Sequence, residues 1–365
     1  MTELITLDEQ YSTTRRVIKA DPTVIADAVK QSNKPEDKFE TVLFLPEGEG
    51  RQGEGGLRTK GYFKVGGGIP DRHSGLDPES PNTATENTVI PANAGISSNQ
   101  SHAITSANSH SREGGNITTQ DQKPLITVVT VVYNGEKFLE ETILSVINQT
   151  YDNVEYIIID GGSTDGTLDI IKKYEHAIDY WVSEKDKGIY DAWNKAISAC
   201  LGGWVSFLGA DDTYENLSLE HYVVAALLNK DINYISSKVV LVKNSKKVRE
   251  IGSEYLTEKL KKYMNFAHVG SLHSVFLFKK FGLFTLEYKI TSDYDFFLRN
   301  INCINACFLN EVTANMNVGG VSDGSIRALS EAYKIRKYYG YTNWFSKLNY
   351  YFTVFKWLVR KKIWY

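Results

Sequence analysis

The feature that most constrains this fold is a regular alternation of apolar runs and helical patterns that begins near residue 125. ITVVTVVY (126–133) is a continuous, β-branched run, which is typical of a strand buried on both faces of a parallel sheet. EKFLEETILSVINQ (136–149) follows with its apolar residues at helical spacing. The strand and helix signals then repeat in VEYIIID, LDIIKKYE, IDYWVS, GIYDAWNKAISAC and WVSFLG. Such alternation predicts a mostly parallel α/β sheet with right-handed crossovers, flanked by helices.

Polar residues follow these predicted strands where each one ends. In open sheets of this kind, ligands bind beyond the carboxyl ends of the strands. We therefore expect a binding site built from the strand ends, which carry Tyr133, Asn134, Asp160, Asp186, Asp211 and Asp212.

Most of these strand-end residues also have a purely structural interpretation. Asn134 with Gly135 could form only a turn, and Asp160 could be a turn residue. Tyr133 could pack in the core. Asp165 could serve as a helix cap.

The adjacent pair Asp211 and Asp212 is harder to explain structurally. Two like charges at the end of a buried strand cost free energy unless a cation or hydrogen-bond donors compensate them. Mg²⁺ or Mn²⁺ is typically held by one or two carboxylates together with substrate phosphates. The pair therefore indicates a divalent metal that bridges to a diphosphate.

The segments IDGGSTDGT, SEKDKGIYDAWNKAI and FLGADD resemble motifs of family 2 glycosyltransferases of the GT-A fold, over roughly residues 124–325. The likeness is closest to the bacterial branch that builds lipopolysaccharide, capsule or exopolysaccharide. In that family the aspartate pair is an abbreviated DXD motif. The resemblance implies that Asp212 holds the metal and that Asp211 contacts the metal and the ribose or sugar. It also implies a nucleotide-sugar site that includes Val131, Tyr133, Asn134, Asp160, Asp186, Lys187 and Asp191.

The resemblance also implies a general base, which an inverting transfer needs to take the proton of the acceptor hydroxyl. In KITSDYDFFLRN (289–300) the family commonly has Glu-Asp, whereas this chain has Ser292 and Asp293. Asp293 then matches the base, with a helix N-cap as its alternative. Asp295 is a second candidate, or simply a helix N-terminal charge. His273 is expected near the acceptor, or as a packed or surface residue.

Composition sets limits on the partners and on the cell compartment. The formal net charge of −3 argues against a general nucleic-acid binder. The three cysteines lack the spacing of a disulfide framework or zinc site, which favours reduced thiols in a reducing compartment. The first ten residues lack the basic start of a signal peptide, and no run approaches the roughly 20 apolar residues of a membrane helix. We therefore expect a cytoplasmic location, peripheral to the inner face of the bacterial inner membrane.

Composition also divides the chain into four parts. Residues 1–65 form a partly ordered extension, with a helix at TVIADAVKQ, a strand at KFETVLFLP and a flexible loop at GEGRQGEGGLRTKG. Residues 66–122 are a low-complexity insert that we expect to be disordered. Residues 123–325 form the glycosyltransferase domain, whose glycine-rich 319–325 segment suits a mobile loop. Residues 326–365 are basic and aromatic, which fits either a helical segment at an anionic membrane or a packed region with a solvated basic face.

The sequence thus predicts an inverting, metal-dependent hexosyltransferase. The expected donor is a nucleoside diphosphate sugar, with UDP as the expected nucleotide. The expected acceptor is a glycan or a lipid-linked glycan. One alternative is a catalytically dead protein of the same fold. Another is a sugar nucleotidyltransferase, but that class needs a glycine-rich, arginine-containing loop where this chain has YNGEK (133–137).

Overall fold

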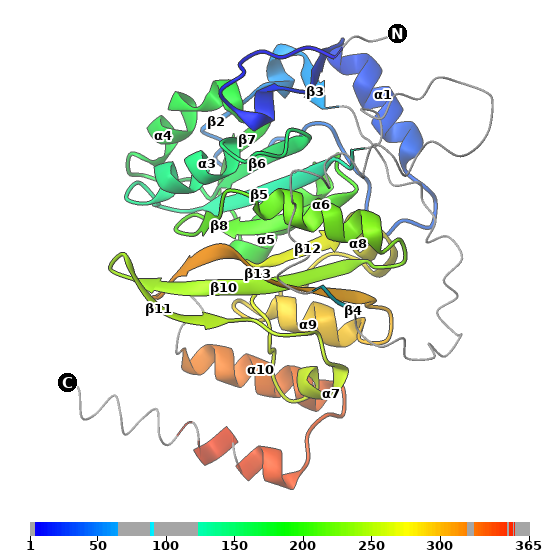
Figure 1. Ribbon diagram of the computed structural model, residues 1–365, viewed down its shortest axis with the longest axis vertical. Coiled ribbons are helices and arrows are strands. Elements are labelled where there is room, and N and C mark those ends of the chain that lie inside the picture. Colours follow the sequence, from blue (N-terminus) through cyan, green and yellow to red (C-terminus); the bar gives the residue numbers. More distant parts are fainter. Residues whose placement is uncertain are drawn as a thin grey trace.

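The computed structural model describes residues 4–64, 88–90, 123–319, 325–348, 350–352 and 354. An eleven-stranded sheet runs through the described part of the chain, in the order β2-β7-β6-β5-β8-β12-β10-β13-β4, with β11 paired to β10 and β9 to β13 (Figure 1). Its strands are β2 (Gly53–Gly55), β4 (Thr88–Ile90), β5 (Ile126–Val132), β6 (Val154–Asp160), β7 (Tyr180–Ser183), β8 (Trp204–Gly209), β9 (Thr213–Tyr214), β10 (Tyr234–Lys243), β11 (Lys246–Ile251), β12 (Ser271–Ser274) and β13 (Ala306–Asn317).

Helices cover both faces of this sheet. The α-helices among the described residues are α1 (Pro22–Ser32), α3 (Leu139–Ile147), α4 (Thr167–Lys173), α5 (Ile189–Ser198), α6 (Ser218–Leu228), α7 (Thr257–Leu260), α8 (Val275–Phe281), α9 (Ser292–Arg299) and α10 (Ile326–Tyr338). Of these, α1 packs beside the small cluster of Ile18, Leu43 and Phe63 and not on a face of the sheet. One hydrophobic cluster joins the sheet to α3, α4 and α6, and a second joins it to α5, α8, α9 and α10. Neighbouring residues of β5 contribute to opposite clusters, Val128 to the first and Val129 to the second. This double burial explains why the strand is apolar throughout.

Strands β7, β6, β5 and β8 are parallel neighbours, and α3, α4 and α5 lie between them in the chain. The predicted α/β fold class, a mostly parallel sheet flanked by helices, is therefore confirmed. In the second half of the chain, the apolar residues after Ser274 form helix α8.

The N-terminal segment adds an edge to the same sheet. The expected helix at TVIADAVKQ is α1. The expected strand at KFETVLFLP does not form, because its backbone amides donate elsewhere: Val42 to the Ser198 carbonyl at 2.8 Å, and Leu45 to the Tyr180 hydroxyl at 2.8 Å. Part of the segment expected to be a flexible loop instead forms β2, which pairs antiparallel with β7.

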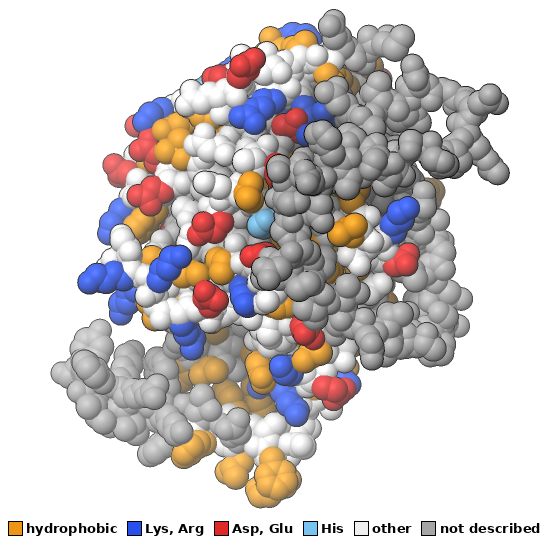
Figure 2. All heavy atoms as spheres, viewed as in Figure 1, with side chains coloured by type: hydrophobic (Ala, Val, Ile, Leu, Met, Phe, Trp, Pro, Cys, Tyr) orange, Lys and Arg blue, Asp and Glu red, His pale blue; other side chains and the backbone are white. Residues whose placement is uncertain are grey.

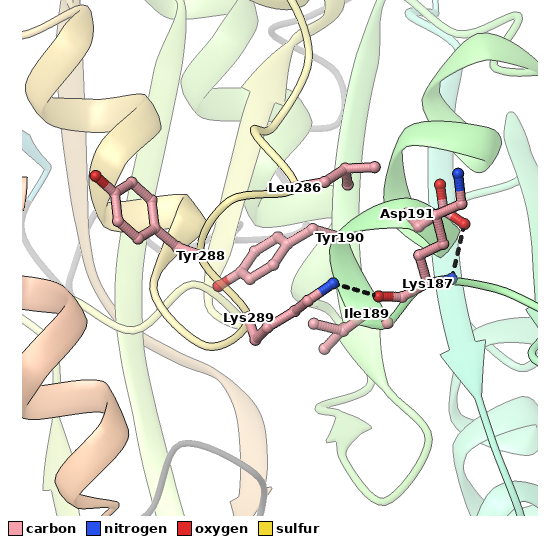
Figure 3. Close-up of a pocket in the computed structure, with 8 residues that line it drawn as sticks. Lys187, Ile189, Tyr190, Asp191, Leu286, Tyr288 and Lys289 are labelled. Atoms are coloured by element: carbon pink, nitrogen blue, oxygen red, sulfur yellow. Dashed lines mark hydrogen bonds between the residues drawn. The ribbon is translucent and has the colours of Figure 1, made fainter.

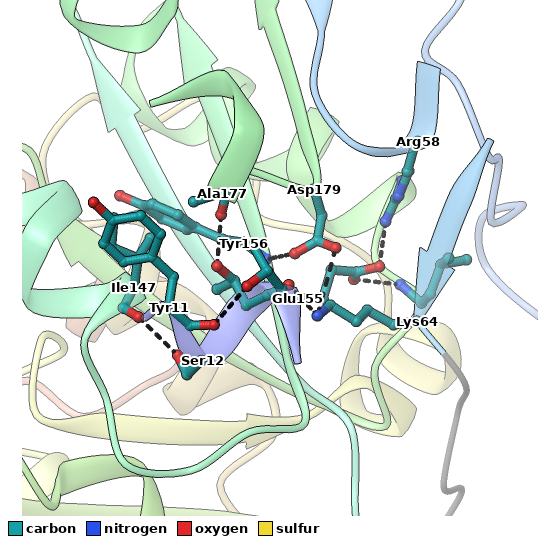
Figure 4. Close-up of polar contacts among 12 residues, drawn as sticks. Tyr11, Ser12, Arg58, Lys64, Ile147, Glu155, Tyr156, Ala177 and Asp179 are labelled. Atoms are coloured by element: carbon teal, nitrogen blue, oxygen red, sulfur yellow. Dashed lines mark hydrogen bonds and ion pairs between the residues drawn. The ribbon is translucent and has the colours of Figure 1, made fainter. Parts of the chain in front are cut away.

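Buried charges attach this N-terminal segment to the sheet (Figure 4). The guanidinium of Arg58 pairs with Glu155 of β6, which also accepts a hydrogen bond from the Thr127 hydroxyl at 2.6 Å. The ammonium of Lys64 lies 4.0 Å from a carboxylate oxygen of Asp179. Because an unpaired buried charge is costly, these contacts tie residues from the extension to the core of the sheet.

The insert and the C-terminal part are described only in part. Within the insert, β4 pairs parallel with β13, and the remainder of 66–122 lies outside the described residues. The tail begins with α10, which packs against α9 through the fully buried Ile335 (Figure 1). In the part of the chain that the structure describes, no helix has the length and apolar character needed to cross a membrane.

Candidate active site

The acidic pair lies directly after β8, as the sequence predicted. Asp212 is 5% exposed and Asp211 is half-buried. Both carboxylates lie beside Gly209: a Cβ at that position would be 2.5 Å from Oδ2 of Asp212 and 3.3 Å from Oδ1 of Asp211. The absence of a side chain at Gly209 is what lets the two groups gather there.

The acidic pair has no basic ion-pair partner among the described residues. None of the ion pairs among the described residues involves Asp211 or Asp212. Burial, followed by the neighbouring Asp211 carboxylate, raises the pKa of Asp212 to about 7. Burial also raises the pKa of Asp211. The described residues contain no cluster of three or more metal-ligating side chains. Two carboxylates without an ion-pair partner nevertheless fit a divalent cation that takes its other ligands from phosphate and water.

Asn317, at the end of β13, supports the acidic pair and was missed by the sequence analysis. Its backbone N–H donates to Oδ1 of Asp212 at 3.0 Å, and its side-chain amide donates to the Asp211 carbonyl. Because β13 is far away in the chain, only the sheet topology brings it to this site. A lone asparagine at a strand end carried no signal in the sequence.

The first two strand ends are joined by hydrogen bonds. Asn134 has a left-handed backbone (φ 52°), and its side-chain oxygen accepts from the Thr164 amide at 2.9 Å. The amide of Asn134 donates to the Ser163 hydroxyl at 2.7 Å. Asp160 is fully buried and accepts from the Ser163 amide at 3.0 Å and the Ser183 hydroxyl at 2.5 Å. Asn134 and Asp160 thus make hydrogen bonds of the kind expected of turn residues. Nucleotide binding remains a prediction for both.

Tyr133 is not a core residue, since its side chain is 65% exposed. It projects near Gly161, where an added Cβ would lie 3.5 Å from the tyrosine ring. Val131, two residues earlier, pairs with Gly209 across the β5–β8 ladder. This register places the end of β5 directly beside the acidic pair.

The loop after β7 and the start of α5 carry three more of the predicted nucleotide-sugar-binding residues, Asp186, Lys187 and Asp191. Asp186 accepts from the Gly188 amide at 2.7 Å, and Asp191 accepts from the Lys187 amide at 2.9 Å. A Cβ on Gly161 would lie 2.5 Å from Asp186, so this carboxylate reaches the second strand end. Burial raises the pKa of Asp186.

Asp293 lies in the first turn of α9 and faces the start of α5, the helix that follows this loop. Its Oδ1 accepts a hydrogen bond from the Tyr190 hydroxyl at 2.9 Å. Burial raises the pKa of Asp293 to about 6. A small cavity next to this contact is lined by residues on both sides of it (Figure 3), namely Lys187, Gly188, Ile189, Tyr190, Asp191, Leu286, Tyr288 and Lys289. The chain therefore brings the loop after β7 and the start of α9 together, although about 100 residues separate Tyr190 from Asp293.

Asp295 and His273 lie in different surroundings. Asp295 is buried and accepts from the Tyr339 hydroxyl at 3.1 Å, so it contacts the segment after α10 rather than Tyr190. His273 is fully buried in β12, with its ring against Tyr234 and Phe207. The packed interpretation describes the contacts that His273 makes, and a role near the acceptor remains a prediction for it. Most of the glycine-rich 319–325 loop lies outside the described residues.

Comparison with known proteins gives a consistent result. Residues 127–284 match the model of "Glycosyl transferase family 2". An uncharacterized glycosyltransferase of Rickettsia typhi is 31% identical over 53% of this chain and 64% of its own length. A putative teichuronic acid biosynthesis glycosyltransferase of Bacillus subtilis is 40% identical over 27% of this chain and 40% of its length. A PGL/p-HBAD biosynthesis glycosyltransferase of Mycobacterium bovis is 29% identical over 55% of this chain and 80% of its length.

Solved structures show weaker likeness. Staphylococcus aureus TarS 1–349 in complex with UDP has a TM-score of 0.48 and 19% identity, covering 59% of this chain and 65% of that one. The mannosyltransferase PcManGT from Pyrobaculum calidifontis, in complex with GDP-Man and Mn²⁺, has a TM-score of 0.44 and 18% identity, covering 58% and 65%. The chain thus spans slightly less than two thirds of the Rickettsia typhi relative and of both solved chains.

Proposed function

Because residues 127–284 make the chain a member of glycosyl transferase family 2, we propose that it transfers a sugar from a nucleoside diphosphate sugar to a growing bacterial surface glycan. The expected donor is UDP-linked, and the expected acceptor is a glycan or lipid-linked glycan of a lipopolysaccharide, capsule or exopolysaccharide pathway. The names of the relatives support a role in polysaccharide or glycolipid biosynthesis.

The observation that carries this proposal is the pair Asp211 and Asp212 after β8, in which Asp212 is buried and neither carboxylate has an ion-pair partner among the described residues. We propose that Asp212 and Asp211 hold Mg²⁺ or Mn²⁺ on the donor diphosphate. A bound divalent cation would act as a Lewis acid and stabilise the charge of the departing nucleoside diphosphate. Asn317 orients Asp212, and Gly209 leaves the room that the two carboxylates need.

The nucleoside would occupy the neighbouring strand ends. Tyr133 offers an exposed ring for stacking on the base, next to Gly161 and Asp186. We propose that Val131, Asn134, Asp160, Lys187 and Asp191 complete this subsite.

Asp293 is the proposed general base. A base is most effective when its pKa lies near the working pH, and burial moves the pKa of Asp293 from 3.8 to about 6. At pH 7 the carboxylate is mostly ionised and able to take the proton of the acceptor hydroxyl. A single base that activates the acceptor directly supports an inverting transfer.

The acceptor proposal draws on the segment after α10. Large apolar side chains in this segment are each more than half exposed: Trp344, Phe345, Leu348, Tyr351 and Phe352. Hydrophobic side chains gather at the lower end of the molecule in Figure 2, where this segment lies in Figure 1. Exposed aromatic residues among lysines suit the surface of an anionic membrane, where lipid-linked acceptors reside. We therefore propose a peripheral location on the inner face of the inner membrane.

The test is nucleotide release from a panel of UDP-glucose, UDP-galactose, UDP-N-acetylglucosamine, GDP-mannose and dTDP-rhamnose, with and without Mn²⁺. We expect Mn²⁺-dependent release from one donor class, lost in D212N and retained in D169N, which alters an exposed aspartate of α4. With a saccharide acceptor, NMR of the product should show an inverted anomeric configuration. Equal activity of D212N and the parent chain would refute the metal role. No release from any donor would refute the transferase proposal.

A further inference from the structure

Glu331, on helix α10, binds the chain segment that leads into helix α9. Its carboxylate accepts hydrogen bonds from the backbone amides of Lys289 at 3.1 Å, Ile290 at 2.9 Å and Thr291 at 3.3 Å. The Thr291 hydroxyl donates to the same group at 3.3 Å. Arg327, one turn earlier on α10, donates its Nε–H to Glu331 at 2.9 Å. We call segment 289–291 together with Glu331 the α10 bracket.

Glu331 is an unusual residue to find in this place. It is only 6% exposed, although glutamate is rarely buried unless it is paired. Burial alone would raise the pKa of Glu331, but the Ile290 amide and Arg327 lower it below its ordinary value, so the group stays charged. A charged acceptor receiving several backbone N–H groups makes stronger hydrogen bonds than a neutral one.

Segment 289–291 of the α10 bracket determines the orientation of the Asp293 side chain. Thr291 precedes the first residue of α9, and Asp293 is the second residue of that helix. The Tyr190 hydroxyl contacts both the Ile290 carbonyl, at 2.8 Å, and the Asp293 carboxylate, at 2.9 Å. Any shift of Ile290 therefore changes the contact that orients Asp293.

A second contact holds the other side of the same segment. The ammonium group of Lys289 donates to the Lys187 carbonyl at 2.8 Å, in the loop after β7 (Figure 3). Segment 289–291 thus lies between α10 on one side and the proposed nucleotide loop on the other. A small displacement of α10 would be passed to both.

We propose that Glu331 is a positioning residue for the transfer reaction, which couples the docking of the C-terminal helix α10 to the orientation of Asp293. This inference rests on the proposed function, because it assigns Asp293 the role of base. It also makes α10 part of the catalytic unit, whereas the sequence analysis drew a boundary at residue 325. The match to the family model ends at residue 284, before Asp293 and α10.

The test compares E331Q, E331D and K334Q in Mn²⁺-dependent release of the nucleoside diphosphate from the active donor of the panel, with water as acceptor, between pH 5 and pH 8. Glutamine keeps the size of the side chain but replaces one accepting oxygen with a donor group. Aspartate keeps the charge and is one methylene shorter. K334Q is the matched control, because Lys334 is an exposed residue of the same helix. Thermal melting and UDP binding are measured for each variant.

For E331Q we expect kcat to fall about 100-fold, as misplacement of a catalytic group by about 1 Å does, while the donor KM stays within about twofold. The acidic limb of the kcat profile should move to lower pH, because a loosened Asp293 becomes more hydrated and its pKa falls. E331D should keep more activity than E331Q, and K334Q should match the parent chain. If E331Q does not fold, E331D must still lower kcat with an unchanged KM.

Two results would overturn the inference. One is E331Q with kcat and pH profile equal to those of the parent chain. The other is a loss of activity that follows only from a lower melting temperature or a raised KM, with no change in the pH profile. That outcome would mean that Glu331 only holds α10 in place and does not orient Asp293. Failure of the parent chain to release nucleotide from any donor would instead refute the proposed function itself.

Discussion

His268 offers a sharp test of the core that supports the site. Its ring stacks on Trp193 at a centroid distance of 4.7 Å and on Phe207 at 5.1 Å. Both ring nitrogens are buried and have no hydrogen-bond partner among the described residues. Burial lowers the pKa of His268 from 6.5 to about 3. The folded protein therefore holds this ring neutral in a pH range where the unfolded chain protonates it.

The substitution H268F should remove a defined pH dependence of stability. Below pH 6.5 the unfolded chain binds a proton that the folded protein refuses until about pH 3, so stability is lost as pH falls through this window. Between pH 7 and pH 5 the loss is about 2 kcal/mol for this one group. Phenylalanine keeps the ring stacking and removes no side-chain hydrogen bond to the described residues, so it should not show that loss.

The assay is urea unfolding of both proteins at pH 5, 6 and 7, with the difference between their unfolding free energies taken at each pH. Groups that do not contact His268 cancel in this difference, including Asp179, whose raised pKa acts in the opposite direction. The pKa of His273 is lowered first by burial and only then by His268, so burial should keep that ring neutral in both proteins. We expect the stability of H268F relative to the parent chain to rise by about 2 kcal/mol from pH 7 to pH 5. Parallel stability curves would show that His268 titrates normally, and would refute the reasoning.

Three further predictions concern the site and its support. G209A should lower Mn²⁺-dependent nucleotide release about tenfold or more, because the new Cβ would lie 2.5 Å from Asp212, whereas G203A, with nothing within 4 Å, should be neutral. R58M should lower the urea-derived unfolding free energy by about 3–5 kcal/mol, since it leaves Glu155 buried and unpaired, and the double variant R58M/E155Q should recover most of that loss. D293N should lower kcat about 100- to 10,000-fold with little change in donor KM, and a normal kcat would remove Asp293 as the base.

The membrane proposal can be checked by co-sedimentation with phosphatidylglycerol vesicles. The double variant W344S/F345S removes two exposed aromatic residues and should weaken binding to these vesicles. V24S is the matched control, because Val24 is similarly exposed but lies on α1, in the N-terminal segment. Phosphatidylcholine vesicles should bind the parent chain less, because they lack negative charge. Unchanged sedimentation of the double variant would argue against this surface.

Local periodicity explains which elements were predictable. Strands β5 to β8 and helices α3 to α5 appear where the apolar runs and helical spacing indicated, because both signals depend on neighbours within a few residues. The segment 38–46 has an equally apolar pattern but makes no ladder, since its amides bond to Ser198 and to the Tyr180 hydroxyl. Conversely, Gly53–Gly55 has little strand propensity and becomes β2 only because β7 offers it an edge.

The sequence by itself determined the parallel sheet and the acidic pair at one strand end, because Asp211 and Asp212 directly follow an unmistakable strand. Only the tertiary structure decided what surrounds that pair. Asn317 reaches Asp212 because β13 pairs with β9, the short strand that follows the acidic pair, and Glu331 reaches residues 289–291 because α10 packs beside α9. Such contacts join residues that are distant in the chain. The sequence around a single polar residue does not indicate which distant residue it will contact.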